Sequence, residues 1–264
     1  MDFTEKFFGY FKYPDGSYAP YNDEKGGGSF GDWRHYIWIV AVPAISVFAY
    51  RYFRKHPEKA RRTIVILAIV LLCLRLTFQI IKVTYGDERP LLRMLPFHQC
   101  AVMGILLPFV VLFDLKKLKM PIYSIAMMGG IATIAFGEYF KSSFFSFYSI
   151  EGIISHTILI VIPLIEIASG QFSLDIRKSW SVFVGMLLLM GWATLANEVF
   201  FKSYKTNYMF LKKSGFPDGF GGSYYFLLYV LIFIFVYACM FVPPLLYKRL
   251  HKKLETENVS LKPA

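Results

Sequence analysis

Long, nearly uninterrupted apolar stretches recur along the 264-residue chain, and they constrain its fold more than any other feature. Several of them approach the roughly 20 residues that an α-helix needs to cross a bilayer. They are continuous runs and not alternations of apolar and polar residues, so a transmembrane β-barrel is not expected. Aromatic residues make up 19% of the chain, more than a soluble domain of this length carries. The sequence therefore predicts an all-α, polytopic membrane helix bundle.

Seven transmembrane helices are predicted, at 34–53, 62–84, 96–114, 120–140, 150–170, 179–201 and 223–247. Three parts of the chain follow from them: an aromatic and glycine-rich leader over 1–33, a transmembrane domain over 34–247 and a basic tail over 248–264. The leader has no apolar core of the kind found in cleavable signal peptides. No second domain is expected.

The orientation follows from lysine and arginine in the short connections. Four basic segments fall on the same side of a seven-span chain: 51–62, 114–119, 174–178 and 248–253. This pattern predicts an N-terminus outside the cell and a C-terminus in the cytoplasm. Because the net charge of +11 is spread over such connections, nucleic-acid binding is not expected.

Polar residues gather in the outer halves of the predicted spans. Arg75, Gln79 and Lys82 are spaced by four and three residues and share one helical face. The other members of this set are His98, Cys100, Glu138, Tyr139, His156, Asn197, Glu198, Asn207 and Tyr208. The cytoplasmic halves read as almost wholly apolar, and such one-sided clustering favours a site that faces the outer leaflet. The structural alternative is that Lys82 snorkels to the interface and Arg75 pairs with an acid.

Cys100 is the candidate nucleophile. It falls in the first turn of a predicted helix, where the N–H groups and the positive end of the helix dipole favour a thiolate. His98 is two residues away, about 200° around the helix axis, so His156 on another span is the better general base. Cys73 and Cys239 lie in apolar surroundings and are interpreted as packing residues. No metal site is expected, because no ligand pair with a recognised metal spacing is present.

Three short motifs resemble those of a known family. LPFHQC at 95–100, SHTILI at 155–160 and TNYMFL at 206–211 are similar to signatures of the YwaF-type bacterial integral membrane proteins. Eukaryotic relatives of that family are transmembrane acyltransferases that move fatty acyl chains between phospholipids. The resemblance covers about residues 34–247. It implies a seven-helix enzyme of the bacterial plasma membrane, with Cys100 as nucleophile and His156 as base.

The expected function is transfer or hydrolysis of a phospholipid acyl chain through an acyl-cysteine at the outer leaflet. The candidates for binding the substrate or its oxyanion are His98, Arg75, Gln79, Asn197, Asn207, Tyr208 and Glu138. No cofactor is expected, because the glycines of MGGIATIAFG at 128–137 read as helix-packing residues and not as a phosphate loop. The alternatives are a transporter or lipid-binding protein that uses the same polar pocket, and a scaffold whose polar groups only join helices.

Overall fold

The computed structural model describes residues 7–8, 10–12, 18–20, 33–84, 95–136, 146–204, 206–214 and 222–260. The chain divides into two compact units, an N-terminal unit (Met1–Phe220) and a C-terminal unit (Gly221–Ala264). The described residues are almost entirely helical, as predicted. The exception is a short hairpin in the leader, where β1 (Tyr10–Lys12) and β2 (Tyr18–Pro20) pair antiparallel. Among the predicted site residues, Glu138 and Tyr139 lie outside the described residues, as does the side chain of Lys82.

The helices follow the apolar runs. Those of the N-terminal unit are α2 (Trp33–Lys55), α3 (Ala60–Thr84), α4 (Gln99–Leu112), α5 (Lys116–Phe136), α6 (Phe147–Ala168) and α7 (Ser179–Leu195), the last continued by a π-helical turn, Ala196–Phe200. Short 3₁₀ turns are found at Pro57–Lys59, Ile176–Lys178, Lys202–Tyr204 and Tyr208–Phe210. In the C-terminal unit, a 3₁₀ turn at Gly222–Tyr224 leads into α8 (Tyr225–Ser260), a single 36-residue helix.

Six of the described helices are long and apolar enough to cross a membrane. The third predicted span differs, because α4 has only 14 residues, Gln99–Leu112, where 96–114 was expected. The helix begins late because His98 is its N-cap, with extended dihedral angles, so Pro96 precedes the helix and is not in its first turn. It ends early because Asp114 adopts a left-handed conformation with φ 46°.

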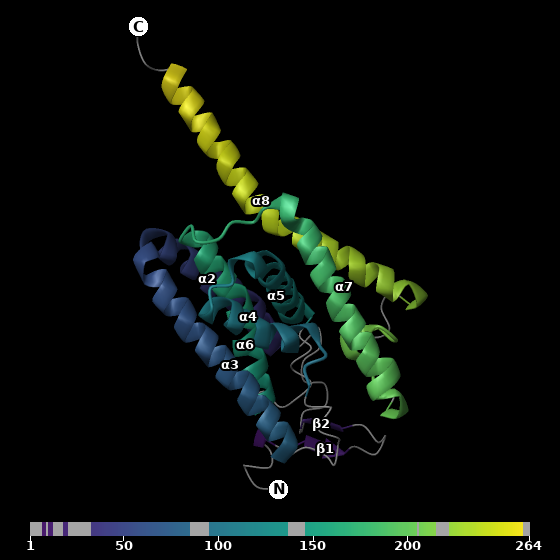
Figure 1. Ribbon diagram of the computed structural model, residues 1–264. Coiled ribbons are helices and arrows are strands. Elements are labelled where there is room, and N and C mark those ends of the chain that lie inside the picture. The colour runs from purple at the N-terminus through teal and green to yellow at the C-terminus, as the bar shows by residue number, and fades with distance from the viewer. Residues whose placement is uncertain are drawn as a thin grey trace. The chain divides into compact units, whose positions relative to one another are not determined.

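Contacts within the N-terminal unit define the two ends of a bundle in which α3, α4, α5 and α6 pack around one another (Figure 1). At one end, the ring of His35 at the start of α2 contacts the carbonyl of Ala135 at the end of α5, at 3.1 Å. At the other end, Arg61 at the start of α3 donates to the carbonyl of Val111 near the end of α4, at 2.9 Å. α2 and α5 are therefore antiparallel, and α4 runs back along α3.

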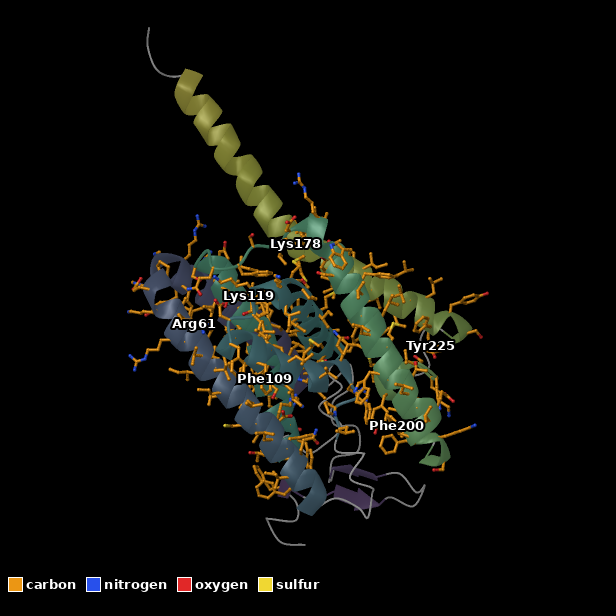
Figure 2. The ribbon with its side chains drawn as sticks, viewed as in Figure 1. Arg61, Phe109, Lys119, Lys178, Phe200 and Tyr225 are labelled. Carbon is orange, nitrogen blue, oxygen red and sulfur yellow. The ribbon has the colours of Figure 1, made fainter. Side chains whose placement is uncertain are left out.

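The central and outer helices differ in burial. Most of α5 and α6 is buried, whereas α2 and α7 expose large apolar side chains such as Phe48 and Leu188, each 70% exposed. In Figure 2, Arg61, Lys119 and Lys178 lie near one end of this unit and Phe200 lies near the other. An apolar exterior around a better-packed centre is the arrangement that suits helices surrounded by lipid. α2 packs on α6, and α7 packs on α5.

Glycines allow the central helices to approach closely. A Cβ at Gly130 of α5 would lie 2.8 Å from Ile160 and 3.0 Å from the carbonyl oxygen of His156, both on α6. A Cβ at Gly129 would meet α4 in the same way. The prediction that these two glycines serve helix packing is confirmed.

Candidate functional site

Cys100 is the second residue of α4, directly after the N-cap His98 and Gln99. Its Sγ lies 3.6 Å from Thr133 Oγ1 of α5 and against Gly129 of the same helix. The neighbouring Gln99 is buried and donates from Nε2 to the carbonyl of Ile125, at 2.8 Å, which fixes the first turn of α4 on α5. The thiol therefore faces the interior of the bundle at a helix N-terminus, as the sequence predicts.

His156 lies in the middle of α6 and is buried. Its Nδ1 bonds to the carbonyl of Gly152, one turn earlier. Because a carbonyl can only accept, the Nδ1 carries the proton, and the neutral ring has its lone pair on Nε2. This tautomer is the one that a general base working through Nε2 requires.

One pair of glycines separates the two predicted catalytic residues. Gly129 packs on Cys100, and the next residue, Gly130, packs on the backbone of His156. Both residues therefore lie at the same level of the bundle, on neighbouring faces of one turn of α5, because adjacent residues of a helix are about 100° apart around its axis. The sequence-based prediction that they share a depth in the membrane agrees with this placement.

Arg75 of α3 forms a buried ion pair with Glu151 of α6, with Nη2 to Oε1 at 3.2 Å. The side chains of Arg75 and Glu151 are 8% and 3% exposed, so both are withdrawn from the bundle surface. Ser155, one turn after the glutamate, donates to the same Oε1 at 2.6 Å. The structural alternative predicted that Arg75 pairs with an acid, and that acid is Glu151.

The Arg75 side chain lies along α4 close to the thiol. A Cβ at Gly104 would be 2.7 Å from its Nε and 2.9 Å from its Cδ, so this glycine makes room for the guanidinium stem. Gly104 is one turn after Cys100 on the same helix. The positive charge interacts electrostatically with both Cys100 and His156. α3, α4, α5 and α6 thus bring a thiol, an imidazole, a cation and a carboxylate together.

Gln79 lies one turn beyond Arg75 and is partly buried. Its Oε1 is buried and has no hydrogen-bond partner among the described residues, and the same holds for the Nε of Arg75. Both atoms belong to the polar face of α3 that the spacing of these residues predicts.

A second group of predicted residues lies after α7. The buried Asn197, in the π-helical turn, binds the backbone of Tyr208 twice: its Nδ2 donates to the carbonyl at 3.0 Å, and its Oδ1 accepts from the N–H at 2.8 Å. The ring of Tyr208 in turn lies 5.2 Å from that of His98. Met209 and Phe210 follow with φ of 54°, and the Met209 N–H points to His98 Nδ1 at 3.5 Å. Asn197 therefore holds this segment over the start of α4.

The side chains of Asn207 and Lys212 make their contacts within the connection that follows α7. The Oδ1 of Asn207 accepts from the N–H groups of Lys212 and Lys213, and its Nδ2 donates to the carbonyl of Lys213, so it closes its own loop. Lys212 Nζ donates to the carbonyl of Asn197 and pairs with Glu198 at 2.9 Å. These residues organise the connection after α7 around Asn197 and His98.

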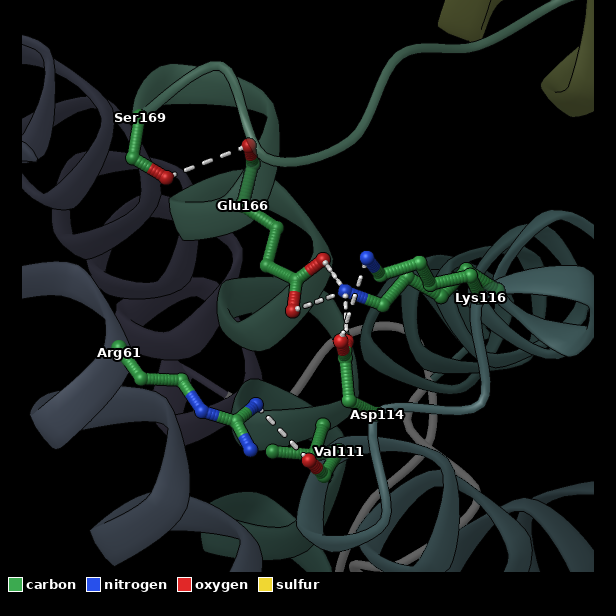
Figure 3. A network of polar contacts seen from close by, with 7 residues as sticks. Arg61, Val111, Asp114, Lys116, Glu166 and Ser169 are labelled. Atoms are coloured by element: carbon green, nitrogen blue, oxygen red, sulfur yellow. Dashed lines mark hydrogen bonds and ion pairs between the residues drawn. The ribbon is translucent and has the colours of Figure 1, made fainter.

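A second buried ion cluster lies at the opposite end of the bundle (Figure 3). Lys119 of α5 contacts both carboxylate oxygens of Glu166 of α6, at 2.8 and 3.0 Å, and Asp114 at 3.0 Å. Glu166 is fully buried and Lys119 is 6% exposed. The interpretation of this half as almost wholly apolar is therefore wrong. It failed because Lys119 reads as part of a basic loop, and the sequence does not show that its partner is Glu166, near the end of α6.

Three residues near Cys100 and His156 were not predicted from the sequence: Thr133, Glu151 and Ser155. Glu151 had a usable signal, because a carboxylate within an apolar helix is costly unless it is paired. Among the described residues, no group of three or more His, Cys, Asp and Glu residues is arranged to hold a metal ion.

The chain matches a known family of membrane proteins. The TMEM164 family, a family of membrane proteins, matches residues 29–242. The chain belongs to the TMEM164 family. The TMEM164 match extends from before α2 into α8 and includes every predicted site residue. No curated protein and no solved structure matches the chain. Together with the apolar helices, the family assignment identifies a multi-pass membrane protein.

Proposed function

We propose that this protein is an integral membrane acyltransferase, or lipid acyl hydrolase, that works through an acyl-cysteine on Cys100. The observation that carries the proposal is that Cys100 and His156 pack on the adjacent glycines Gly129 and Gly130 of α5, while Arg75 lies against Gly104, one turn along α4 from Cys100. A nucleophile at a helix N-terminus, a base with its lone pair on Nε2 and a nearby cation are the parts that thiol-based acyl transfer needs. The YwaF-type motifs, with their acyltransferase relatives, point to the same chemistry.

In the first half-reaction, His156 Nε2 takes the proton from the Cys100 thiol, and the thiolate attacks the ester carbonyl of a phospholipid. The first N–H groups of a helix have no partner within it, so those of α4 can donate to the oxyanion. Collapse of the tetrahedral intermediate breaks the ester C–O bond. The lysophospholipid leaves with the proton from His156, and the acyl chain stays on Cys100 as a thioester.

In the second half-reaction, the hydroxyl of another lipid, or water, gives its proton to His156 and attacks the thioester. The C–S bond breaks, the thiolate leaves and the proton returns to Cys100. The chemistry balances without an oxidant, a metal or a nucleotide. Phospholipids are the donor and, for the transferase, a lipid hydroxyl is the acceptor.

In this proposal, the segment after α7 binds the headgroup of the phospholipid. Arg75 is already paired with Glu151, which makes it a poorer phosphate ligand than the sequence suggests. Lys202 and Lys213 are exposed in the segment that Asn197 and Tyr208 hold over His98. A lysine is a common point-charge ligand for a phosphate.

The proposed topology has seven crossings, with the N-terminus outside and the site toward the outer leaflet of a bacterial plasma membrane. Support for counting α4 as a crossing comes from its ends, because Val111 meets the start of α3 and Cys100 meets the end of α5. A membrane-impermeant thiol reagent, applied to intact cells that carry a variant without native cysteines, should label a cysteine at position 27. It should not label one at position 252. The reverse pattern would place the site at the cytoplasmic side.

A non-covalent lipid binder or transporter is the alternative. The Lys119–Glu166 cluster favours it, because buried polar groups then occur at both ends of the bundle, as a pathway across the membrane would need. Such a protein would bind lipid without forming an adduct.

The deciding experiment measures acyl exchange between defined phospholipids in proteoliposomes, together with mass spectrometry of Cys100. An acyl adduct of thioester mass is expected on the wild-type protein. Cys100→Ser should nearly abolish exchange, because a serine hydroxyl needs far more help from a base than a thiol does. His156→Ala should fall to a similar floor, and the double variant should be scarcely worse, because the two residues act as one unit.

The matched control is Cys73→Ser on α3. Cys73 is exposed on the helix surface, so its substitution should leave exchange and thermal stability largely unchanged. Full exchange in folded Cys100→Ser protein would rule out the covalent mechanism.

A further inference from the structure

The Arg75–Glu151 ion pair involves a third helix, besides the two helices that carry its charges. The guanidinium reaches from α3 past Gly104 of α4 to a carboxylate on α6. Replacing the hydrogen of Gly104 by a methyl group would put a carbon 2.7 Å from Arg75 Nε. The path of the side chain is therefore set by α4, the helix that carries Cys100.

We propose that Glu151, braced by Ser155, is a positioning residue that holds the Arg75 guanidinium beside Cys100, where its positive charge stabilises the thiolate. The inference rests on the proposed role of Cys100 and adds residues that the resemblance does not assign. Glu151 supplies one oxygen to both partners: Oε1 accepts from Ser155 Oγ at 2.6 Å and faces Arg75 Nη2 at 3.2 Å.

Electrostatics gives the pair a second task. A lone guanidinium would favour the thiolate of Cys100 but would disfavour the imidazolium that forms when His156 takes the proton. The carboxylate of Glu151 is paired with that guanidinium, so the cation near the base does not stand alone. Both charges interact with Cys100, and Arg75 has the larger effect. The pair therefore leaves a net positive influence at the sulfur without a bare cation beside the base.

The bundle contains its own control for this inference. Lys119 and Glu166 form a second buried ion pair between neighbouring helices, at the far end from Cys100. If buried pairs matter only because they hold helices together, neutralising either pair should have the same effect on Cys100. If Arg75 acts on the sulfur, only the Arg75–Glu151 pair should matter.

The test measures the rate at which iodoacetamide alkylates Cys100 in detergent, as a function of pH. The background carries Cys73→Ser and Cys239→Ser, so that Cys100 is the one thiol. The double variant Arg75→Gln/Glu151→Gln keeps polar side chains and removes both charges. Its alkylation at pH 8 should be about tenfold slower, with a pH profile displaced upward by about one unit, the usual effect of a nearby charge. In the control double variant Lys119→Gln/Glu166→Gln, the alkylation rate of Cys100 should stay within about twofold of the background protein, because distant sites act independently.

A smaller change guards against loss of folding. Ser155→Ala removes only the hydroxyl that braces Glu151 and should slow alkylation about threefold. Its matched control is Ser124→Ala on α5, another fully buried serine, whose hydroxyl has no partner among the described residues. That control should leave the rate unchanged. If the Arg75/Glu151 double variant does not fold, the Ser155→Ala rate decides.

The outcomes separate two ideas. Background rates in the folded Arg75→Gln/Glu151→Gln variant would overturn the positioning role. Slowed alkylation in that variant, with no acyl adduct on the wild-type protein, would support the positioning role and overturn the proposed acyl transfer alone.

Discussion

Gly129 of α5 lies directly against Cys100 of α4: a Cβ at position 129 would be 3.0 Å from the sulfur and 2.8 Å from Nε2 of Gln99. No real Cβ is accommodated at such distances without movement of a neighbour. The position of the thiol is thus tied to the absence of a side chain on the next helix.

Gly129→Ala should therefore disturb the site. The added methyl group must displace Cys100 or break the hydrogen bond from Gln99 to Ile125, and overpacking of this kind costs about 1–3 kcal/mol of stability. The rate of acyl exchange should fall by a larger factor than the fraction of folded protein. Gly191→Ala on α7 is the control, since no atom of the described residues lies within 4 Å of a Cβ there. Equal thermal stability and exchange in both variants would contradict the packing described for Gly129.

Glu166→Gln should destabilise the opposite end of the bundle. It removes the carboxylate that contacts Lys119 through both oxygens, and breaking a buried ion pair costs about 3–5 kcal/mol. The remaining contact of Lys119 with Asp114 reduces this loss. The double variant Lys119→Met/Glu166→Met should be the more stable of the two, because it leaves no buried charge. Thermal unfolding in detergent measures the stability of both variants. A melting temperature lower in the double variant than in Glu166→Gln would contradict the buried ion pair between Lys119 and Glu166.

Asn197→Ala should loosen the segment over His98. It leaves the N–H and the carbonyl of Tyr208 without their side-chain partner, at a cost of about 2–3 kcal/mol. Exchange should fall because the contact between Met209 and His98 is lost with it. Thr194→Ala, three residues earlier and exposed, is the control. An unchanged melting temperature in Asn197→Ala would show that Tyr208 is held in another way.

Asp114 gives an acid-dependent stability. The hydrogen bond from Lys119, which outweighs desolvation, holds the pKa of this carboxyl below its usual range. A lowered folded-state pKa contributes stability that is present above the unfolded value, about 3.9, and is lost as the pH falls through the folded value.

Asp114→Asn should consequently lose less stability than the wild-type protein when the pH is lowered from about 5 to about 2. Asparagine suits the test, because it tolerates the left-handed backbone at this position. Melting temperatures measured over that range should converge at the acid end. Parallel curves for the two proteins would contradict the role of Lys119.

The sequence was sufficient to predict the all-helical, membrane-spanning architecture. Apolar runs predict where the chain forms the helices of the bundle, and the spacing of Arg75 and Gln79 predicts that they share one face of α3. Cys100 and His156 were singled out by the chemistry of their residue types, and their catalytic roles stay predictions. The start of α4 was misjudged, because Pro96 is compatible with both a first helical turn and the extended segment before an N-cap.

Partners between helices could not be predicted in the same way. Glu151 and Glu166 each sit in an apolar helix, and both need a cation, but periodicity along one helix does not show which neighbour supplies it. Arg75 comes from α3 and Lys119 from α5. Only the packing of α6 between those helices makes the assignment.

α6 carries both of these carboxylates, 15 residues and therefore about 22 Å apart along its axis. Each is costly in hydrocarbon when alone, by about 2.5–3.5 kcal/mol on insertion scales. The partner of Glu151 is synthesised before α6, on α3, and that of Glu166 lies on α5. During biogenesis, the free-energy cost of inserting α6 is therefore lowest when α3 and α5 are already beside it as it leaves the translocation machinery. The order in which the helices are made supplies both cations first.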